Sequence, residues 1–272
     1  MYEIVEKRVL NENVKLMKIN APLIAKKAMP GQFIILRIDD KGERIPLTVA
    51  DYDREAGLIT IIFQEVGLTT IRLGKLEKGD FLLDFVGPLG TPSHLEGYKH
   101  ACVIGGGLGT AIAYPQAKAL HELGCQVDMI NGFRNKDLII LEEECKSVAD
   151  NLYITTDDGS NGTKGFVTDI LKEQIQHKTY DLVIAIGPLI MMKFVSKLTK
   201  EHNIKTIVSM NPVMVDGTGM CGGCRVTVDG KTKFACVDGP DFDGHLVDFD
   251  EAMMRQKMYK KEENHKCNLE KY

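Results

Sequence analysis

The chain has 272 residues, of which 44% are hydrophobic and 26% are charged, and its formal net charge is −4 at pH 7. This is the composition of an ordinary soluble protein, and the slight negative charge gives no reason to expect nucleic acid or an anionic membrane as a partner. No apolar run approaches the ~20 residues that a bilayer crossing needs, and the N-terminal stretch MYEIVEKRVL lacks the apolar run of a secretory signal, so we expect a cytoplasmic protein.

Residues 1–97 are predicted to form β-structure. Short segments rich in β-branched residues alternate with the turn sequences PGQ, DDKGE and REAG. The predicted strands are residues 3–10, 13–20, 32–39, 47–53, 58–66 and 79–87. Six strands at this spacing predict a small antiparallel barrel.

From residue 98 to residue 211 strands and helices alternate. The predicted strands are residues 100–107, 125–133, 151–159, 180–188 and 205–211. The predicted helices are residues 110–124, 137–149, 166–176 and 189–203. This alternation is typical of a parallel sheet with crossover helices, as in nucleotide-binding α/β domains.

The third part, residues 212–272, breaks this rhythm. Residues 212–245 are rich in glycine and cysteine, and the charged tail is predicted to be helical over residues 250–264. The predicted order is therefore a barrel, a nucleotide-binding α/β domain and a metal-binding appendage. A cleft is expected between the first two parts, because ligands commonly bind at such interfaces.

A run of glycines marks the first junction between strand and helix in the α/β domain. The sequence VIGGGLGT places them at Gly105, Gly106, Gly107 and Gly109. Glycine lets the backbone approach a pyrophosphate, and the following helix N-terminus attracts the anion. The spacing departs from G-x-G-x-x-G, because the third glycine would fall at Thr110. A tight turn without a ligand is the alternative.

The choice of nicotinamide is not settled by the residues that follow. The second strand ends in MINGFRN, where the acidic residue expected for NAD is missing. Arg134 in this stretch either binds the cofactor, which would favour NADP, or is a solvated surface residue. Asp157 and Asp158 follow the third strand, and they either accept hydrogen bonds from a ribose or nicotinamide or cap their own loop. Gly187 and Pro188 end the fourth strand, where a glycine leaves room for a flat ring.

Two stretches of the barrel suit a flavin dinucleotide. ERIPLTVAD carries Arg44, Pro46, Leu47 and Thr48 at the start of a strand, where an arginine meets phosphate and the backbone meets a planar ring. EVGLTTIRL carries Gly67, Thr69 and Thr70 ahead of a short helix, which is a predicted pyrophosphate cradle. Each stretch alone also fits a purely structural role, and their occurrence together favours FAD.

Three of the chain's seven cysteines, Cys221, Cys224 and Cys236, lie close together in the sequence. Asp216 precedes the first of them by five residues. In a reducing compartment this spacing indicates metal or redox chemistry rather than disulfides. The loop is an iron–sulfur site with one ligand replaced, a zinc site, or a loop without metal. His245 is an alternative fourth ligand. Cys102, Cys125 and Cys145 are interpreted as small packing residues, and Cys267 is assigned no role.

The motifs RIPLT, GLTT, GGGLG and TDDGS, followed by D-x4-C-x2-C-x11-C, together resemble the ferredoxin–NADP reductase superfamily over nearly the whole chain. Within it the chain is similar to the electron-transfer subunits that carry FAD and a [2Fe–2S] cluster. These include subunits of dihydroorotate dehydrogenase, with four cysteines, and of the electron-bifurcating NADH-dependent reduced ferredoxin:NADP⁺ oxidoreductases, in which aspartate takes the first place. The sequence DGTGMCGGC resembles the latter group.

The resemblance implies a site for each cofactor. It implies that FAD is bound by Arg44, Pro46, Leu47, Thr48, Gly67, Thr69 and Thr70. It implies that NAD(H) is bound by Gly105, Gly106, Gly107, Leu108, Gly109 and Thr110, with Asp157, Gly187 and Pro188 nearby. It implies that Asp216, Cys221, Cys224 and Cys236 hold the cluster, and carboxylate oxygen is an acceptable ligand for ferric iron.

The resemblance also implies an electron-transfer role. Hydride would pass between NAD(H) and FAD, and single electrons would reach a larger partner that carries a second flavin and [4Fe–4S] clusters and handles NADP(H) and ferredoxin. Because the cofactors supply the chemistry, no catalytic side chain is predicted. The alternatives are the electron-transfer subunit of a dihydroorotate dehydrogenase and, from another class, a non-redox scaffold with structural zinc.

Overall fold

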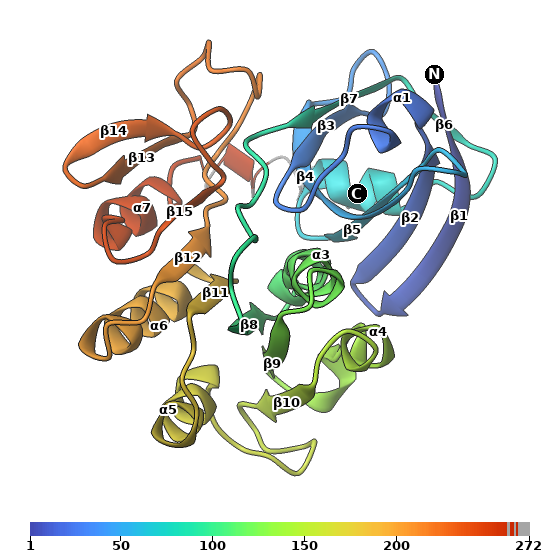
Figure 1. The fold of residues 1–272 in the computed structure, drawn as a ribbon. Coiled ribbons are helices and arrows are strands. Elements are labelled where there is room, and N and C mark those ends of the chain that lie inside the picture. The colour runs from blue at the N-terminus through green and yellow to red at the C-terminus, as the bar shows by residue number, and fades with distance from the viewer. Residues whose placement is uncertain (260–261, 264, 266–272) are drawn as a thin grey trace.

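The structure is a computed structural model that describes residues 1–259, 262, 263 and 265. An antiparallel barrel-like sheet is followed by a mainly parallel sheet with helices and by a small cysteine-bearing region (Figure 1). The predicted fold class is confirmed, because these parts occur in the predicted order. The predicted boundaries after residues 97 and 211 stay a prediction. Cys267 lies outside the described residues.

The barrel sheet has the strand order β6-β1-β2-β5-β4-β3-β7, with antiparallel neighbours. Its strands are β1 (Tyr2–Asn11), β2 (Val14–Asn20), β3 (Phe33–Arg37), β4 (Ile45–Asp53), β5 (Leu58–Gln64), β6 (Phe81–Leu82) and β7 (Asp84–Leu89). Alternating apolar residues fill its interior, where Ile34, Phe63 and Phe85 are almost completely buried. Two short helices connect the strands, α1 (Pro22–Ala25) and α2 (Leu68–Gly74).

The prediction of six strands is wrong at the last segment, residues 79–87, which forms two strands. β6 pairs with β1, whereas β7 pairs with β3 at the other end of the sheet. Leu83 lies between them, and its backbone N–H donates to the carbonyl oxygens of Arg37 and Ile38, both at 3.1 Å. One continuous segment therefore joins both ends of the sheet and closes the barrel, which leaves fewer open strand edges.

The second sheet has the order β10-β9-β8-β11-β12-β15, and all neighbours are parallel except β12 and β15. Its parallel strands are β8 (His100–Gly106), β9 (Gln126–Phe133), β10 (Asn151–Thr156), β11 (Leu182–Ile186) and β12 (Thr206–Ser209). Its helices are α3 (Gly109–Glu122), α4 (Glu142–Lys146), α5 (Val167–His177) and α6 (Leu189–Glu201). The β–α alternation predicted from the sequence is confirmed.

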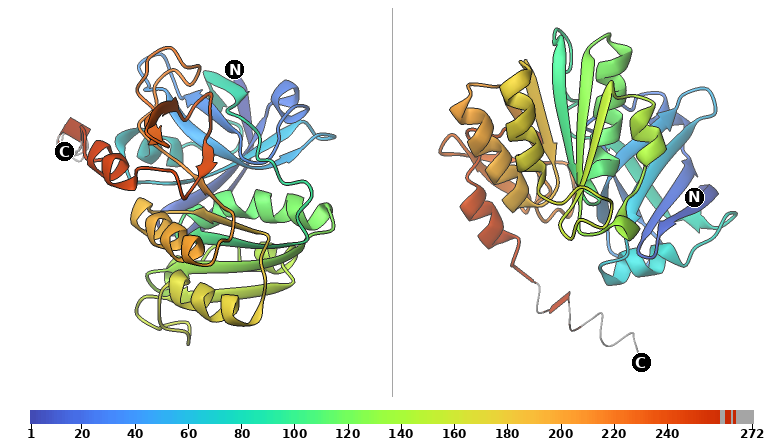
Figure 2. Two further views of the ribbon diagram at one scale, coloured as in Figure 1. Left: turned by 60° about the vertical axis from the view of Figure 1, so that its left-hand side comes forward. Right: turned by 90° about the horizontal axis from the view of Figure 1, so that it is seen from below.

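The helices cover the two faces of this sheet in pairs (Figure 2). Val103 belongs to the apolar cluster formed with α3 and α4, and its neighbour Ile104 belongs to the cluster formed with α5 and α6. Because successive strand residues point to opposite faces, a continuous apolar strand serves both layers. α3 also faces the barrel, where Lys118 pairs with Asp51 of β4 at 2.9 Å.

The helix predicted over residues 137–149 is shorter than expected. A short 3₁₀ turn, η1 (Lys136–Leu138), comes first, and α4 begins only at Glu142. Leu141 stands between them with a left-handed backbone, φ 55°, that a helix does not accommodate. Ile140 and Leu141 are both buried beside α3, so the apolar run packs as an irregular segment rather than as a helical face.

The cysteine-bearing region is attached to the second sheet. A hairpin of β13 (Arg225–Val228) and β14 (Lys231–Phe234) is followed by β15 (Asp241–Asp243), which pairs with β12, and by α7 (Phe249–Arg255). The helix predicted over residues 250–264 is observed as α7, and part of the remainder lies outside the described residues. None of the described helices has the length and apolar content needed to cross a bilayer.

Candidate cofactor-binding sites

The glycine turn joins β8 to α3, and its glycines are required by close packing. A Cβ atom at Gly109 would lie 2.2 Å from the carbonyl oxygen of Ile186, and one at Gly105 would lie 2.7 Å from the Cα atom of Thr110. Gly107 has a left-handed backbone, φ 57°. The turn therefore brings the start of α3 against β8 and β11, and it leaves the helix N-terminus without a side-chain cap.

This turn stands where the order of the parallel strands reverses. β8 lies between β9 and β11, so the crossovers leave it toward opposite faces, and ligands of such folds bind outside the carboxyl ends of these strands. A Cβ atom at Gly187 would lie 3.0 Å from the Cα atom of Gly106. The structure thus brings the stretch Gly105–Thr110 together with Gly187 and Pro188 at the carboxyl edge of the sheet.

Buried polar atoms lie beneath the turn. The Thr110 hydroxyl and the Asn131 amide are buried and have no hydrogen-bond partner among the described residues. A Cβ atom at Gly105 would lie within 2.8 Å of the side chains of both residues, so they directly underlie the turn. Unsatisfied buried polar groups are costly in a folded protein, and they suit a junction that binds a polar ligand.

Arg134 and Asp157 lie along the same carboxyl edge of the sheet, after the ends of β9 and β10. The N–H of Asp157 donates to the carbonyl oxygen of Phe133 at 3.0 Å, which places the ends of β9 and β10 side by side. Both side chains are exposed. Asp158 caps its own loop by accepting a hydrogen bond from the Ser160 N–H at 2.9 Å, so the capping alternative holds for Asp158.

The barrel presents a strand edge at the predicted flavin site. Residues 45–48 of β4 pair with β3, from Phe33↔Thr48 to Leu36↔Ile45, whereas pairing with β5 begins only at Val49. Backbone groups on that side of residues 45–48 are therefore not used by the ladder, and they suit the polar edge of a planar ring. Arg44 precedes this edge with a half-exposed guanidinium, 3.8 Å from an Asp84 oxygen.

The second flavin stretch forms the start of α2, next to this edge. The Thr69 hydroxyl donates to Glu43 at 3.4 Å and so connects α2 to the loop before Arg44. The Thr70 hydroxyl accepts hydrogen bonds from the N–H groups of Val66 and Gly67, at 3.1 and 3.0 Å. Thr70 therefore caps the helix start, whereas Arg44, the strand edge and Thr69 come together as predicted for one site.

The cluster loop brings two of its three sulfur atoms together. The Cys224 and Cys236 sulfurs lie 3.2 Å apart, and both residues are buried. Cys221 is exposed, and its sulfur accepts a hydrogen bond from the Gly223 N–H at 3.4 Å. No group of three or more metal-binding side chains converges among the described residues.

Asp216 binds the loop itself. One carboxylate oxygen accepts hydrogen bonds from the Thr218 N–H, the Thr218 hydroxyl and the Met220 N–H, and the other accepts from the Cys221 N–H at 3.1 Å. Interactions with the side chains of Cys221 and Thr218, followed by the backbone N–H groups of Thr218 and Met220, hold the pKa of Asp216 far below its usual range. The carboxylate is therefore ionised and adjacent to the first cysteine, as a ligand must be.

His245 does not belong to this loop. Its Nε2 atom lies 3.1 Å from the Thr199 hydroxyl of α6, and its backbone carbonyl oxygen accepts a hydrogen bond from Lys200. Burial is the main cause that lowers the pKa of His245. The structure thus gives the alternative fourth ligand a structural contact with α6, and Asp216 as a ligand stays a prediction.

Two family models match the chain. The iron–sulfur cluster binding domain of dihydroorotate dehydrogenase B matches residues 211–248, and the oxidoreductase NAD-binding domain matches residues 103–197. The chain is 48% identical over 261 residues to a dihydroorotate dehydrogenase B (NAD⁺) electron transfer subunit homolog of Thermotoga maritima, covering 96% of this chain and 92% of that protein. The corresponding subunit of Fusobacterium nucleatum is 32% identical, over 87% of this chain and 95% of its own length.

The chain belongs to the dihydroorotate dehydrogenase B electron-transfer subunit family. A protein of Clostridium beijerinckii, named only by its position in an adh 3′ region, is 58% identical over 99% of this chain and 94% of its own length. Among solved structures, a chain of an NADH-dependent reduced ferredoxin-NADP oxidoreductase, reported in connection with flavin-based electron bifurcation, superposes with a TM-score of 0.93. It is 47% identical and covers 97% of this chain and 95% of its own length.

Membership of this family establishes the coarse function. The chain is an electron-transfer subunit of an NAD-dependent oxidoreductase with an iron–sulfur domain, and FAD, a [2Fe–2S] cluster and NAD(H) are its cofactors. The geometry fits these cofactors. The β4 edge is open for a flavin, and the glycine turn suits a nicotinamide dinucleotide. Two buried sulfurs lie in the same loop as an ionised carboxylate. Which residues hold each cofactor stays a prediction.

One cysteine thiol of this electron-transfer subunit, that of Cys236, is held in its protonated form. Burial, followed by the hydrogen bond with Cys224, raises the pKa of Cys236 to about 12. A thiol in this state binds metal only by losing its proton, and a bound metal ion supplies the positive charge that stabilises the thiolate. The pair therefore suits a site that is completed by iron, rather than a reactive free cysteine.

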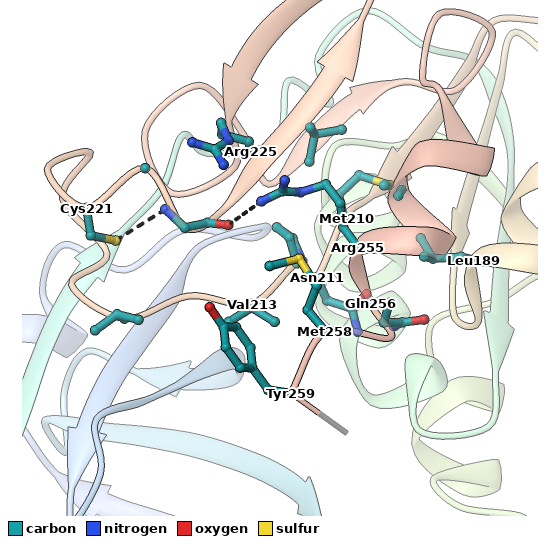
Figure 3. A pocket seen from close by; sticks show the side chains of 16 residues that line it. Leu189, Met210, Asn211, Val213, Cys221, Arg225, Arg255, Gln256, Met258 and Tyr259 are labelled. Atoms are coloured by element: carbon teal, nitrogen blue, oxygen red, sulfur yellow. Dashed lines mark hydrogen bonds between the residues drawn. The ribbon is translucent and has the colours of Figure 1, made fainter. Parts of the chain in front are cut away.

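A cavity of about 260 Å³ lies between the cluster loop, β12 and α7 (Figure 3). Arg255 of α7 donates to the carbonyl oxygen of Gly223 at 3.2 Å, within the ligand loop. Sequence reasoning missed Arg255 and Tyr259, which line this cavity, because a charged tail shows no signal of contact with a loop some 30 residues earlier. An arginine at the end of a short amphipathic helix was the available hint.

Proposed function

We propose that the chain is the small subunit of an electron-bifurcating NADH-dependent reduced ferredoxin:NADP⁺ oxidoreductase. It works as a heterodimer with a larger subunit that carries a second flavin and [4Fe–4S] clusters and that handles NADP(H) and ferredoxin. The observation that carries the proposal is Asp216 in the first ligand position, ionised and hydrogen-bonded to the Cys221 N–H. The similarity to the solved bifurcating enzyme supports it.

When bound, FAD supplies hydride exchange with the nicotinamide, and the [2Fe–2S] cluster supplies one-electron transfer. The residues of the chain bind these cofactors and orient them. The glycine turn and the N-terminus of α3 hold the dinucleotide pyrophosphate, and Gly187 with Pro188 lie beside this turn at the β11 edge. The β4 edge orients the flavin ring, and Arg44 with the start of α2 holds its phosphates.

The cysteine ligands link this subunit to its partner. Cys224 and Cys236 lie buried against the second sheet, whereas Cys221 and Asp216 lie on the exposed side of the loop. These four residues would hold the cluster that supplies one-electron transfer, with Cys224 and Cys236 on its buried side and Cys221 on its exposed side. The exposed side is where a larger subunit would approach to exchange electrons.

A second candidate function is the electron-transfer subunit of a dihydroorotate dehydrogenase. The matching iron–sulfur family model and the names of the curated relatives favour it. The two functions differ in the partner subunit and in the electron acceptor. Asp216 in place of a cysteine favours the bifurcating enzyme, in accordance with the resemblance of the motif.

The native complex distinguishes these functions. The chain should be purified anaerobically from its source with a C-terminal tag, and the partner identified by mass spectrometry. We expect a larger flavin and iron–sulfur subunit, and a complex in which NADPH reduces ferredoxin only when NAD⁺ is present. A complex that oxidises dihydroorotate with NAD⁺ and leaves ferredoxin unreduced would instead establish the second candidate.

A further inference from the structure

Asp241 lies where the three parts of the chain meet. Its Oδ2 atom is 2.5 Å from the Ser93 hydroxyl, in the segment between β7 and β8, and 3.3 Å from the Gln116 amide nitrogen of α3. These partners precede it by 148 and 125 residues. A Cβ atom at Gly31 of the barrel would lie 3.2 Å from the same oxygen. One carboxyl group therefore touches the barrel, the segment that follows it and the nucleotide-binding domain.

Backbone hydrogen bonds surround this contact. The Thr91 N–H donates to the carbonyl oxygen of Gly239 at 2.7 Å, and the Thr91 hydroxyl donates to that of Val237 at 3.1 Å. The Met210 N–H donates to the carbonyl oxygen of Pro240 at 2.9 Å. Residues 237–241, which directly follow the ligand Cys236, are thus held between the segment after the barrel and the end of β12.

The carboxyl group has an unused oxygen. Asp241 Oδ1 and Gln116 Oε1 are both buried acceptors that have no partner among the described residues. Leaving two buried acceptors unpaired is costly, and a proton on the carboxyl group would supply a donor at this position. An aspartate that carries this proton bonds as an amide side chain does, with one donor and one acceptor.

The surroundings of the group favour this proton. Burial is the main cause that raises the pKa of Asp241, and the neighbouring polar side chains of Ser93, Ser209 and Gln116 oppose it. Positive charge on the nearby His94 also lowers the pKa of Asp241. Ser93, Ser209 and Gln116 are uncharged, and His94 is the charged neighbour among these groups.

We propose that Asp241 is a positioning residue for electron transfer: by joining β15 to α3 and to Ser93, it holds the cluster loop at a fixed place relative to the flavin and nicotinamide sites. Asp241 does not touch a reacting atom, and it acts through the segment that leads back to Cys236. The proposal rests on the flavin and cluster of the proposed function, but not on the identity of the larger subunit.

The test compares Asp241→Ala, Asp241→Asn and Asp243→Ala in the full chain loaded with FAD and cluster. Asp243 is the control, since it is exposed on the same strand. NADH is mixed in anaerobically, flavin bleaching is followed by stopped flow, and cluster reduction is followed by rapid-freeze electron paramagnetic resonance. Hydrogen exchange of the segment 237–243 is measured with and without cofactors.

Asp241→Ala should bleach flavin at the wild-type rate, reduce the cluster at least tenfold more slowly, and exchange the amides of residues 237–243 faster. Asp241→Asn should restore both properties, because its amide supplies the same donor and acceptor. Wild-type cluster reduction in Asp241→Ala would overturn the proposal even if exchange became faster. If Asp241→Ala does not fold, Ser93→Ala takes its place with the same expected results.

The pH dependence of hydrogen exchange tests whether the Asp241 carboxyl group carries a proton. A carboxyl group whose pKa is raised by folding stabilises the folded chain fully below the ordinary aspartate pKa, and it loses this stabilisation as pH rises through its raised pKa. Exchange at 237–243 should therefore become faster with rising pH in the wild type, after correction for intrinsic exchange, and stay constant in Asp241→Asn. Identical profiles would overturn the proton's role. A wild-type chain without any cluster signal would instead overturn the cofactor assignment itself.

Discussion

The sulfur atoms of Cys224 and Cys236 lie 3.2 Å apart, although 12 positions separate the two residues in the sequence. The β13–β14 hairpin between them brings them together, because Arg225 pairs with Phe234 in its register. Both cysteines are buried, and both belong to the apolar cluster on the α5 and α6 face of the second sheet. Half of the predicted ligand set is therefore built into the fold.

Replacing Cys224 by serine should abolish cluster assembly while FAD remains bound. Serine is a weak ligand for iron, and the predicted flavin site lies on the barrel rather than on the hairpin. Iron content, acid-labile sulfide and flavin absorbance of the purified variant provide the measurement. Cys145→Ser serves as a control, since Cys145 is buried in α4 and belongs to another apolar cluster. Retention of full iron content in Cys224→Ser would exclude this residue from the ligand set.

Asp216 is predicted to be the fourth ligand, and two variants separate its roles. Asp216→Cys should keep two irons per chain and change the midpoint potential and the resonance spectrum, because a thiolate replaces an oxygen ligand. Asp216→Ala should lose the cluster, since it removes both the oxygen ligand and the four hydrogen bonds that shape the loop. An unchanged potential in Asp216→Cys would show that this residue does not bind iron.

Asp128 of β9 is predicted to be a major contributor to stability. Its buried carboxylate accepts hydrogen bonds from Lys178 at 2.6 Å, Tyr180 at 2.7 Å and Asn151 at 2.8 Å. Asp128→Ala should reduce the free energy of unfolding by about 2–3 kcal/mol, because it leaves the Tyr180 hydroxyl buried without its acceptor. Chemical denaturation measures the loss. Asp40→Ala, at an exposed turn, should be neutral.

The same carboxylate predicts a pH dependence. Burial opposes ionisation of Asp128, but the hydrogen bonds from Lys178, Tyr180 and Asn151 outweigh it and lower its pKa. The stability that Asp128 contributes is therefore present above the ordinary aspartate pKa and is lost as pH falls through its lowered pKa, below about pH 4. Asp128→Asn should show a smaller loss of Tm over this acidic range. Parallel curves for the two proteins would contradict the assignment.

Gly109 is predicted to be required for tight binding of NADH. A Cβ atom there would meet the Ile186 carbonyl oxygen at 2.2 Å, so Gly109→Ala must displace α3 from β11. Overpacking of this kind costs about 1–3 kcal/mol, and it should weaken NADH binding in a titration of flavin reduction. Glu122→Ala is the control, since Glu122 is exposed at the other end of the same helix. Wild-type NADH affinity in Gly109→Ala would place the dinucleotide elsewhere.

The sequence predicted what is encoded locally. The cysteine spacing, the glycine turn and the β–α alternation each occupy a short stretch, and the structure contains them at the expected positions. The contact of Asp241 with Ser93 and Gln116 was not predicted, because it joins ordinary residues that are far apart in the chain. No motif marks such a contact, and only the folded arrangement of β15, α3 and the segment after β7 reveals it.

The two errors in secondary structure have the same origin. The segment 79–87 has the pattern of one strand, but barrel closure divides it at Leu83 between two distant partners. The segment 137–149 has the apolar content of a helix, but the packing of Ile140 and Leu141 beside α3 imposes a left-handed residue. In both cases tertiary packing overrides the local pattern.

The most direct test of the central claim is cofactor analysis of the anaerobically purified chain, combined with addition of NADH. The account predicts one FAD, two irons and two acid-labile sulfides per chain, flavin absorbance that bleaches with NADH, and the resonance signal of a reduced [2Fe–2S] cluster. A protein that contains zinc and no sulfide, or whose flavin does not respond to NADH, would contradict it.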